Sequence, residues 1–538
     1  MNKHTTAQPS FPNPSSSSSL GFSTQLNPAC SYPILSPTDL AHCSSDYVMS
    51  LVSVLQTPEP STYAQEQQHP EWVKAIEQEL LALEHNGTWV LTSLPPGKRA
   101  LTSKWVYKTK FRPDGFVERH KTRLIIRDFE QVKDKDYERT FSPVAKVTTV
   151  RVCIALATAK AWPLHQLDIN NVFLYGFIDE EVYMQPPAGY TKALPGQVCR
   201  LQRSLYDLKQ ASRQWNLELT KFLVAHGFTQ SKYDYSLFSQ HQNGQQIFIL
   251  VYVDDLLIIG DNVTSIAHIK QALHTTYTIK DLGLARYFLG IEISRSPAGT
   301  FLNQRKYIID ILSDVGLIGA KPAKFPLLQG LHLSDVTAPL FPNPKLYRRL
   351  VGILLYLTFT RPDISYAVQH LSQFLQQPAQ AHYQAVLHVL RYLKGTTNRG
   401  LFYPASCTLH LTAYCNADWG TCRLSAKSLT GYCIFLGSSL ISWNTKKQKT
   451  VAKSSAEAEY RAMSATTSEL EWISHLLHDF HIPLSLPVTM HCDNKATMHI
   501  AANSIFHERT KHLRIDCHYT RDKIIEGFLQ TAYVPSKA

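Results

Sequence analysis

The pattern of apolar runs and turn residues is sharpest near the middle of the chain. One apolar run, 247–252, and a second, 256–259, flank the three residues Val253, Asp254 and Asp255. Two short apolar runs bounded by turn residues predict paired strands that are buried on both faces. The sequence therefore predicts a hairpin that carries two adjacent carboxylates at its turn.

Helical and strand-like patterns alternate along the rest of the chain. Apolar residues at helical spacing predict helices at 72–83, 145–161, 203–227, 266–277, 346–358, 364–375, 382–393 and 455–480. Stretches that alternate or are continuously apolar predict strands at 88–91, 103–111, 116–126, 164–169, 287–293, 409–414, 430–436, 440–443 and 488–492. Strands interleaved with helices predict a chain of α+β or α/β domains.

Composition divides the chain into four parts. Its 538 residues are too many for one core. Residues 1–60 are rich in Ser and Pro, which predicts a disordered linker. A mixed part at 61–320 precedes a loop-rich stretch and a helical part at 321–405, and a return to strands begins a last part at 406–538.

Charge and cysteine content restrict the class of protein. The 54 Lys and Arg exceed the 42 Asp and Glu, which favours a polyanionic partner such as nucleic acid, although a basic surface without one is an equal alternative. The ten cysteines form no CxxC pair, which indicates reduced intracellular thiols. The sequence has neither a signal peptide nor an apolar run of membrane-spanning length. We therefore expect no membrane partner and a location in the cytoplasm or nucleus.

The two hairpin carboxylates are candidate metal ligands. Charge beside a core is costly unless it is paired or coordinates an ion, and Mg²⁺ takes carboxylates while substrate phosphates complete its shell. Asp168, near the end of the predicted strand 164–169, supplies a third acid. Three such acids can hold the two ions of a phosphoryl-transfer site. Asp pairs also occur in turns merely to accept local amides, so the hairpin alone leaves both interpretations open.

Ordered motifs carry a resemblance to a known family. They include KWVYKTKFRPDG (104–115), LDINNVFLYG (167–176), SLYDLKQASRQW (204–215), YVDD (252–255), DLGLARYFLGIEI (281–293), SSAEAEYRAM (454–463) and HCDNKAT (491–497). With them, the chain from about residue 59 onward resembles the reverse transcriptase and ribonuclease H region of the copia-type retrotransposon polyprotein.

The resemblance implies a fold and an activity. The fold would be a right-hand polymerase, with fingers and palm at 61–320 and a helical thumb or connection at 321–405, followed by a C-terminally truncated ribonuclease H-like domain at 406–538. The activity would be RNA-directed and DNA-directed DNA synthesis with two Mg²⁺ ions, or Mn²⁺ in their place, per active site. RNA template, DNA primer and dNTPs would be the partners. The resemblance also implies a fragment of an element, dimeric or joined to other polyprotein segments, in the cytoplasm (virus-like particles included) or the nucleus.

The same resemblance assigns site residues. Asp168, Asp254 and Asp255 match the polymerase metal ligands, and Phe173 matches the aromatic residue that lies against the sugar 2′ position. The other substrate-binding positions match residues near the triphosphate, the nascent base pair or the primer, and they are Lys121, Arg123, Lys209, Gln210 and Tyr252. In the nuclease part the matching acids are Glu457 and Asp493, both also metal ligands, and Asp516.

Several positions depart from the family pattern. Asp128 and Asp207 stand where the family has Gly, and such positions often need a positive φ angle or a close backbone approach. Asn170 and Ser212 stand where it has Lys and Pro. Asn416 replaces the first nuclease acid, and Asp418, roughly 6.5–7 Å further along the strand, is too far away to substitute.

These departures leave more than one function open. We expect an active polymerase with an impaired nuclease. A catalytically decayed nucleic-acid-binding remnant is the alternative, and an unrelated Mg²⁺ phosphodiesterase is a third hypothesis that leaves the basic strand 116–126 unexplained.

Overall fold

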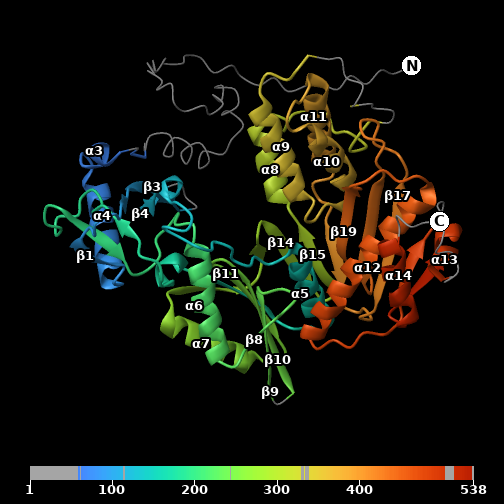
Figure 1. The fold of residues 1–538 in the computed structure, drawn as a ribbon, viewed down its shortest axis with the longest axis horizontal. Helices are drawn as coiled ribbons and strands as arrows, with labels where there is room; N and C mark the ends of the chain where they lie inside the picture. The colour runs from blue at the N-terminus through green and yellow to red at the C-terminus, as the bar shows by residue number, and fades with distance from the viewer. Residues whose placement is uncertain are drawn as a thin grey trace, which may run out of the picture.

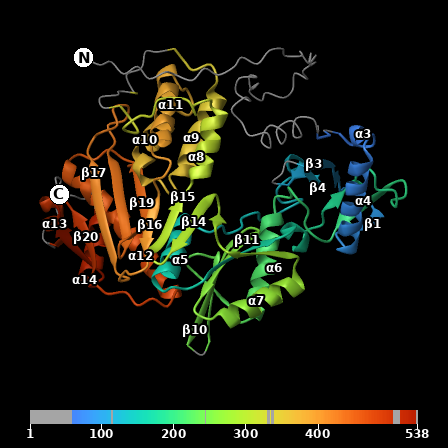
Figure 2. The ribbon, with the colours of Figure 1, turned by 180° about the vertical axis from the view of Figure 1, so that it is seen from behind.

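The computed structural model describes residues 59–60, 62–112, 116–242, 244–328, 333, 339–502 and 514–535. Nearly all of the predicted disordered segment 1–60 lies outside the described residues. Figures 1 and 2 show an amino-terminal lobe, a central sheet, a column of helices and a carboxyl-terminal sheet. The mixed fold agrees with the predicted fold class.

The amino-terminal lobe is built on a two-stranded ribbon and a four-stranded sheet with the order β1-β7-β6-β2. Its elements are α3 (Tyr63–Glu66), α4 (Pro70–His85), β1 (Trp89–Ser93), β2 (Ala100–Leu101), β3 (Ser103–Phe111), β4 (Val117–Ile126), η1 (Asp128–Glu130), β6 (Tyr183–Met184) and β7 (Gln197–Leu201). Helix α4 buries Trp72, Ile76 and Leu83, as its apolar spacing predicts. Trp72 packs edge-to-face on Tyr107 of the ribbon, with ring centroids 5.4 Å apart.

The central sheet has the strand order β12-β5-β11-β10-β9-β8. Its elements are α5 (Val147–Ala159), β5 (Leu164–Ile169), η2 (Val172–Tyr175), α6 (Ala211–Ala225), β8 (Thr229–Gln230), β9 (Leu237–Gln242), β10 (Gln245–Tyr252), β11 (Asp255–Gly260), α7 (Val263–Thr276) and β12 (Ile279–Leu284). The predicted hairpin is confirmed as β10 and β11. Ile249 and Ile258 pack with α6 and α7 on one face, whereas Phe248 and Leu257 pack with α5 on the other.

Two predicted elements are wrong in extent. Residues 287–293 form two strands rather than one, because Leu289 and Gly290 both have positive φ angles and turn the chain between them. A Cβ at Gly290 would lie 1.9 Å from the hydroxyl of Tyr356, which donates to the Leu289 carbonyl. The helix expected from residue 203 begins only at Ala211, because Asp207 also has a positive φ angle.

A third sheet (β13-β14-β15-β16) and a column of helices follow. The elements are β13 (Tyr287–Phe288), β14 (Ile291–Ser296), β15 (Gly299–Asn303), α8 (Arg305–Asp314), α9 (Pro344–Leu357), η4 (Pro362–Ile364), α10 (Ser365–Leu371), η5 (Ser372–Phe374), α11 (Gln380–Gly395) and β16 (Leu401–Pro404). One apolar cluster holds α8, α9, α10 and α11 together. The three helices predicted between 346 and 393 are thereby confirmed.

The carboxyl-terminal sheet has the order β19-β18-β17-β20-β21, with β17, β20 and β21 parallel. Its elements are β17 (Leu411–Asp418), β18 (Leu429–Leu436), β19 (Ser439–Lys447), α12 (Ser455–Asp479), β20 (Val488–Cys492), α13 (Lys495–Ala502), α14 (Arg514–Ile525) and β21 (Leu529–Tyr533). Its core is continuous with that of the central sheet, since Phe480 packs on Phe248 with centroids 4.9 Å apart. In the described part of the chain, no helix is long and apolar enough to cross a membrane.

Candidate functional site

The hairpin and its neighbouring strand bring three acids together. Asp255 of β11 lies directly opposite Asp168 of β5 in the strand register, and Asp254 occupies the turn that precedes β11. The Asp254 carbonyl accepts the amide of Ile169 at 2.9 Å, which ties the turn to β5. The structure thus joins acids that are 86 positions or more apart in sequence.

The turn itself is strained and is stabilised by a hydrogen bond from α6. Val253 has a φ angle of 56°, a region that β-branched residues rarely enter. Its carbonyl accepts the indole N–H of Trp215, a residue of α6, at 2.7 Å. Trp215 is almost completely buried, so a core residue fixes the turn that presents Asp254 to solvent.

The acids perturb one another. Burial raises the pKa of Asp168, and the charge of Asp254 raises it further, whereas Lys280, its register partner on β12, and then Lys121 and Arg123 act in the opposite direction. Burial also raises the pKa of Asp255, and the other two acids add to that effect. Clustered carboxylates whose ionised forms are disfavoured by burial and by one another are a donor set that divalent cations stabilise. The residues therefore fit a Mg²⁺ site.

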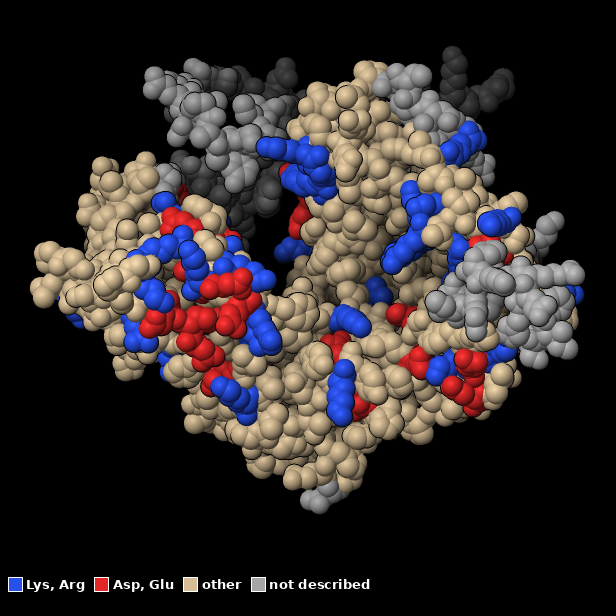
Figure 3. Space-filling view, viewed as in Figure 1, with Lys and Arg blue, Asp and Glu red and all other residues tan. Residues whose placement is uncertain are grey.

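Basic side chains of β4 flank the acids. The charges of Lys121 and Arg123 reach Asp168, as their effect on its pKa shows. Burial lowers the pKa of Lys121, and the charge of Arg123 lowers it further. Figure 3 shows a hollow between the amino-terminal lobe and the column of helices, with basic side chains on both sides. A phosphate-bearing ligand in this hollow would meet cations opposite the acids.

An aromatic pair joins the basic strand to the acid site. Phe173 of η2 follows Asn171, which is left-handed with a φ angle of 55°, and its ring lies edge-to-face on Tyr206 at 5.4 Å. The Tyr206 hydroxyl donates to Asn171 at 3.0 Å, and the Arg123 guanidinium lies 4.6 Å above the Tyr206 ring. Sequence analysis did not single out Tyr206, although it lies inside the SLYDLKQ motif.

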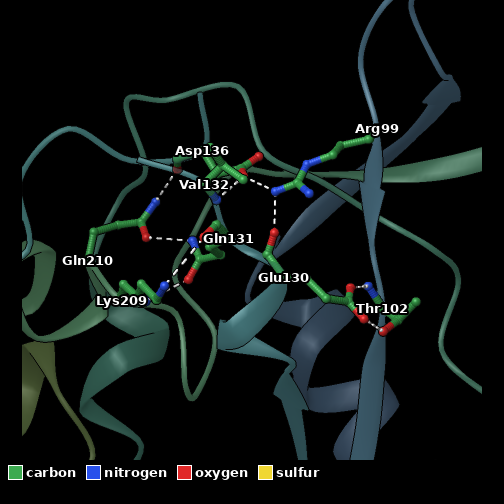
Figure 4. A network of polar contacts seen from close by, with 8 residues as sticks. All are labelled: Arg99, Thr102, Glu130, Gln131, Val132, Asp136, Lys209 and Gln210. Atoms are coloured by element: carbon green, nitrogen blue, oxygen red, sulfur yellow. Dashed lines mark hydrogen bonds and ion pairs between the residues drawn. The ribbon is translucent and has the colours of Figure 1, made fainter. Parts of the chain in front are cut away.

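Gln210 and Lys209 support a loop. Gln210 is fully buried, and its amide donates to the Asp136 carbonyl at 2.9 Å and accepts from Gln131 at 3.0 Å (Figure 4). The Lys209 amide donates to the Gln131 side chain, and the Lys209 ammonium lies 5.2 Å from the ring of Tyr137. In this structure Gln210 contacts the loop 128–137 and is not exposed for direct substrate contact.

The other end of the same loop is anchored to the lobe (Figure 4). Glu130 accepts the hydroxyl and amide of Thr102 at 2.5 and 2.8 Å, and Arg99 contacts both Glu130 and Asp136.

Tyr252, the remaining predicted substrate contact, is partly exposed and pairs with Asp255 in the strand register.

Comparison with known proteins gives the family. The family model for reverse transcriptase (RNA-dependent DNA polymerase) matches residues 86–329. The chain is 41% identical over 485 residues to the retrovirus-related Pol polyprotein from transposon RE1 of Arabidopsis thaliana, covering 90% of this chain and 33% of that protein. It is 34% identical over 308 residues to the putative transposon Ty5-1 protein of Saccharomyces cerevisiae, covering 56% of this chain and all of that protein. The chain belongs to the copia-type retrotransposon polyprotein family.

The chain spans about a third of the length of the long copia-type polyproteins that it matches. Among solved structures, a foamy viral protease–reverse transcriptase in complex with double-stranded DNA aligns with a TM-score of 0.49 and 13% identity, covering 86% of this chain and 69% of that one. The family model covers the central acids and the basic strand, so residues 86–329 are the reverse transcriptase domain of a copia-type polyprotein.

The nuclease-like acids of the copia-type chain lie on α12, β20 and α14. Glu457, a predicted metal ligand, pairs with Arg461 at 2.6 Å and accepts the amide of Lys453 at 2.8 Å, and its metal-ligand role stays a prediction. It lies in the first turn of α12, where Ser454 caps the helix by accepting the Glu457 amide. The Ser-x-x-Glu spacing is a helix-capping signal, which sequence analysis overlooked.

Glu459, two residues later, lies beside Asp493 and Cys492. Its carboxylate lies near those of Asp493 and near the Cys492 thiol, with all three ligand atoms within 4.8 Å of one another. Burial raises the pKa of Glu459 to about 8, and the charges of Cys492, Asp493 and Asp418 add to this. One oxygen accepts the amide of Ala417 at 3.0 Å, so β17 and α12 are joined at this point.

The remaining nuclease residues are spread around this group. Asn416 is exposed on β17 and lines a cavity of about 400 Å³ together with Asp493. Asp418 lies at the end of the same strand. Asp516 falls in α14, and its side chain lies outside the described residues. A neutral amide in place of a hard carboxylate is a poorer ligand for Mg²⁺.

The positions that depart from the copia-type pattern differ in backbone conformation and contacts. Asp207 has a φ angle of 66°, so the concern about a position normally occupied by Gly is confirmed there. Asp128 begins the short helix η1, is exposed and has no positive φ angle. Ser212 is the second residue of α6, where Pro or Ser is acceptable. The backbone amide of Asn170 donates to the Thr278 carbonyl.

Proposed function

We propose that this chain is an RNA-directed and DNA-directed DNA polymerase, in which the amino-terminal lobe serves as fingers, the central sheet as palm and the helical column as thumb. The observation that carries the proposal is the register of Asp168 against Asp255, with Asp254 at the adjoining turn and two cations facing them. Family membership supports the polymerase class, and the three acids support its chemistry.

Asp168, Asp254 and Asp255 would hold two Mg²⁺ ions, with Mn²⁺ as a substitute. When bound, such ions lower the pKa of the primer hydroxyl and neutralise charge on the departing pyrophosphate. The chain's own residues position the substrates. Lys121 and Arg123 would neutralise the triphosphate of an incoming dNTP, because their charges reach the acid site from β4.

Phe173 would select the sugar. Its half-buried ring is fixed by Tyr206, which is itself held by Asn171 and Arg123. A ring that packs on Tyr206 and against two apolar clusters would leave little room for a 2′ hydroxyl, the group that distinguishes RNA units from DNA units. We propose that RNA and DNA templates bind in the basic hollow next to this site.

The test is primer extension on an RNA template by Asp168→Asn and Asp254→Asn. Synthesis should fall to background while duplex binding persists, because binding rests mainly on Lys and Arg contacts to phosphates. Asp261→Asn is the matched control. It changes an acid at the other end of the same hairpin, where the side chain accepts the Gln246 amide and an Asn can still do so. Parental synthesis in either site variant would refute the assignment.

A decayed nucleic-acid-binding remnant is the second candidate, and the left-handed Asp207 favours it. The same assay separates the two functions. A remnant would bind the duplex without extending any primer, whereas an enzyme would lose extension only in the Asp168 and Asp254 variants.

We also propose that the carboxyl-terminal domain is a ribonuclease H-like domain with impaired nuclease activity. Asn416 leaves its site one carboxylate short.

A further inference from the structure

Cys422 lies in a cluster of polar side chains that is separate from the polymerase and nuclease residues. The Ser425 hydroxyl donates to its sulfur at 3.1 Å and the Lys447 ammonium at 3.6 Å. The Cys422 thiol donates to Gln373 at 3.4 Å, and Lys447 donates to the same oxygen at 3.0 Å. These residues come from the loop between β17 and β18, the end of β19, and η5 of the helical column. The fold thus joins a nucleophile to a cation and to a helix residue 74 positions before that cation.

The surroundings of the sulfur favour its thiolate form. Burial raises the pKa of Cys422, but the hydrogen bonds of Ser425 and the charge of Lys447 outweigh burial, so the pKa is lower than that of an ordinary thiol. Burial raises the pKa of three cysteines outside the cluster, which are Cys153, Cys199 and Cys433. The thiolate is the reactive form of cysteine, and Cys422 is only half-buried. It is therefore a nucleophile that a solute can reach.

A cavity beside the sulfur selects the charge of that solute. The cavity has a volume of about 350 Å³, and Cys422 and Lys447 line it together with Arg423 and Lys427. Among the described residues of its wall there is no Asp or Glu. Arg423 is exposed, so the wall extends to the surface. Figure 3 shows Lys and Arg side chains where the helical column meets the carboxyl-terminal sheet. A solute that carries carboxylates would meet cations there without a competing acid.

We propose that Cys422 is a site of reversible modification by a small anionic disulfide of the glutathione class. The Cys422 thiolate attacks one sulfur of the disulfide, and a bond forms between these two sulfurs. The disulfide bond of the reagent breaks, and its other half leaves as a thiolate that takes up the proton Cys422 released to solvent. The Cys422 sulfur is oxidised while the departing sulfur is reduced, so the reaction needs no other oxidant.

Lys447 and the rest of the basic wall have different roles in this reaction. Lys447 stabilises the attacking thiolate, whichever disulfide reacts, whereas Arg423 and Lys427 attract the carboxylates of the reagent. The modification requires neither DNA synthesis nor a metal ion, so failure of the polymerase proposal would not affect it.

The test compares three disulfides on the purified full chain: oxidised glutathione, which is anionic, hydroxyethyl disulfide, which is neutral, and cystamine, which is cationic. Mass spectrometry of peptides follows the modification of each cysteine with time. Cys422 should react before Cys407, another half-buried thiol, which donates to two carbonyl oxygens. Each rate is divided by that of a small free thiol with the same reagent. The quotient should fall from oxidised glutathione through hydroxyethyl disulfide to cystamine.

Lys447→Met tests the thiolate. In water a cation about 4 Å away favours an anion by about fivefold, and the greater nucleophilicity of a more basic thiolate offsets part of that factor. The variant should therefore slow the reaction with hydroxyethyl disulfide by about two- to fivefold and shift the pH profile of the rate upward. Lys447→Arg should restore both. Lys446→Met is the matched control, since Lys446 is the exposed neighbour on β19 and is not among the described residues that line the cavity.

Lys427→Gln tests the basic wall and leaves the cluster around the sulfur intact if Lys447→Met does not fold. It should lower the rate with oxidised glutathione relative to that with hydroxyethyl disulfide. An unchanged ratio in this variant, or an unchanged pH profile in a folded Lys447→Met, would overturn the proposal. So would modification of Cys422 no earlier than that of Cys407, or equal normalised rates for the three disulfides.

Discussion

Replacing Asp207 with Gly should stabilise the protein. Asp207 has a φ angle of 66° and its side chain is exposed. The left-handed backbone therefore costs conformational free energy that no buried contact of this side chain offsets. The left-handed conformation costs an ordinary residue about 1–2 kcal/mol. Glycine loses about 0.5–1 kcal/mol more chain entropy on folding. The middle of these two ranges gives a net gain of about 0.5–1 kcal/mol. With an unfolding entropy of about 2.1 cal/mol/K per residue, this corresponds to an increase in Tm of about 0.5–1 °C if the whole chain unfolds together.

The control is the other Asp at a position where the family has Gly. Asp128→Gly removes the same side chain from an exposed site whose φ angle is not positive, so only the entropic cost remains, and Tm should fall or stay unchanged. Thermal unfolding of both variants, followed by circular dichroism, measures the difference. A decrease in Tm for Asp207→Gly, or equal shifts in the two variants, would refute the argument from backbone strain.

Three further predictions follow from the two sites. Phe173→Ala should admit ribonucleotides, and an unchanged ratio of rNTP to dNTP incorporation in a variant that still polymerises would contradict the proposed role. Asn416→Asp should raise cleavage of an RNA–DNA hybrid with Mg²⁺, and adding Glu459→Gln should remove the gain. In metal-free protein the pKa of Glu459 is raised from its usual value near 4.5 to about 8, so stability is lost as the pH rises between those two values and is not lost further above them. The decrease in Tm that this group causes between about pH 5 and 8 should disappear in Glu459→Gln, and its persistence would show that another group titrates.

Local patterns predicted most of the strands, including those that carry Asp168 and Asp255, but not which strands pair. The hairpin at Asp254 and the strand that carries Asp168 each show a strong local signal, and the family motifs connected them. The pairing of Asp168 with Asp255 is a long-range contact that no local pattern encodes. The turn at Leu289 was missed because its left-handed backbone lies inside an apolar run typical of a strand.

The nuclease acids show what packing adds to the sequence. Glu457 and Glu459 are two residues apart on one helix, so they point in different directions, and only the packing of α12 on β17 determines which one meets Asp493. The capping pattern that begins at Ser454 identifies Glu457 as a helix-start residue. The metal-ligand role of Glu457 stays a prediction.

The central and carboxyl-terminal sheets share a core, and this predicts that the reverse transcriptase part depends on its neighbour. Helix α5 is buried over ten consecutive residues, 149–158. From it, the Arg151 guanidinium donates to the Ile441 carbonyl at 3.3 Å and lies 3.6 Å from the centre of the Trp443 ring. A desolvated cation–π contact is worth about 2 kcal/mol. The packing of Phe480 on Phe248 adds apolar burial of roughly 1.5–3 kcal/mol.

A chain that ends at residue 405 loses all of these contacts, and Arg151 keeps only its hydrogen bonds to the Phe359 carbonyl. It should unfold at a lower Tm than the full chain, bind a dye for exposed apolar surface, and regain stability when residues 406–538 are added in trans. Trp443→Ala in the full chain isolates the stacking contact and should cause a smaller decrease. Equal Tm values for the truncated and full chains, with no dye binding, would mean that α5 is stable without its second neighbour. The carboxyl-terminal domain would then be structurally separate, despite the shared core. If the decrease is found, the reverse transcriptase part depends for its stability on the surface of the carboxyl-terminal domain that packs on α5. Selection would then still act on that surface after loss of nuclease activity.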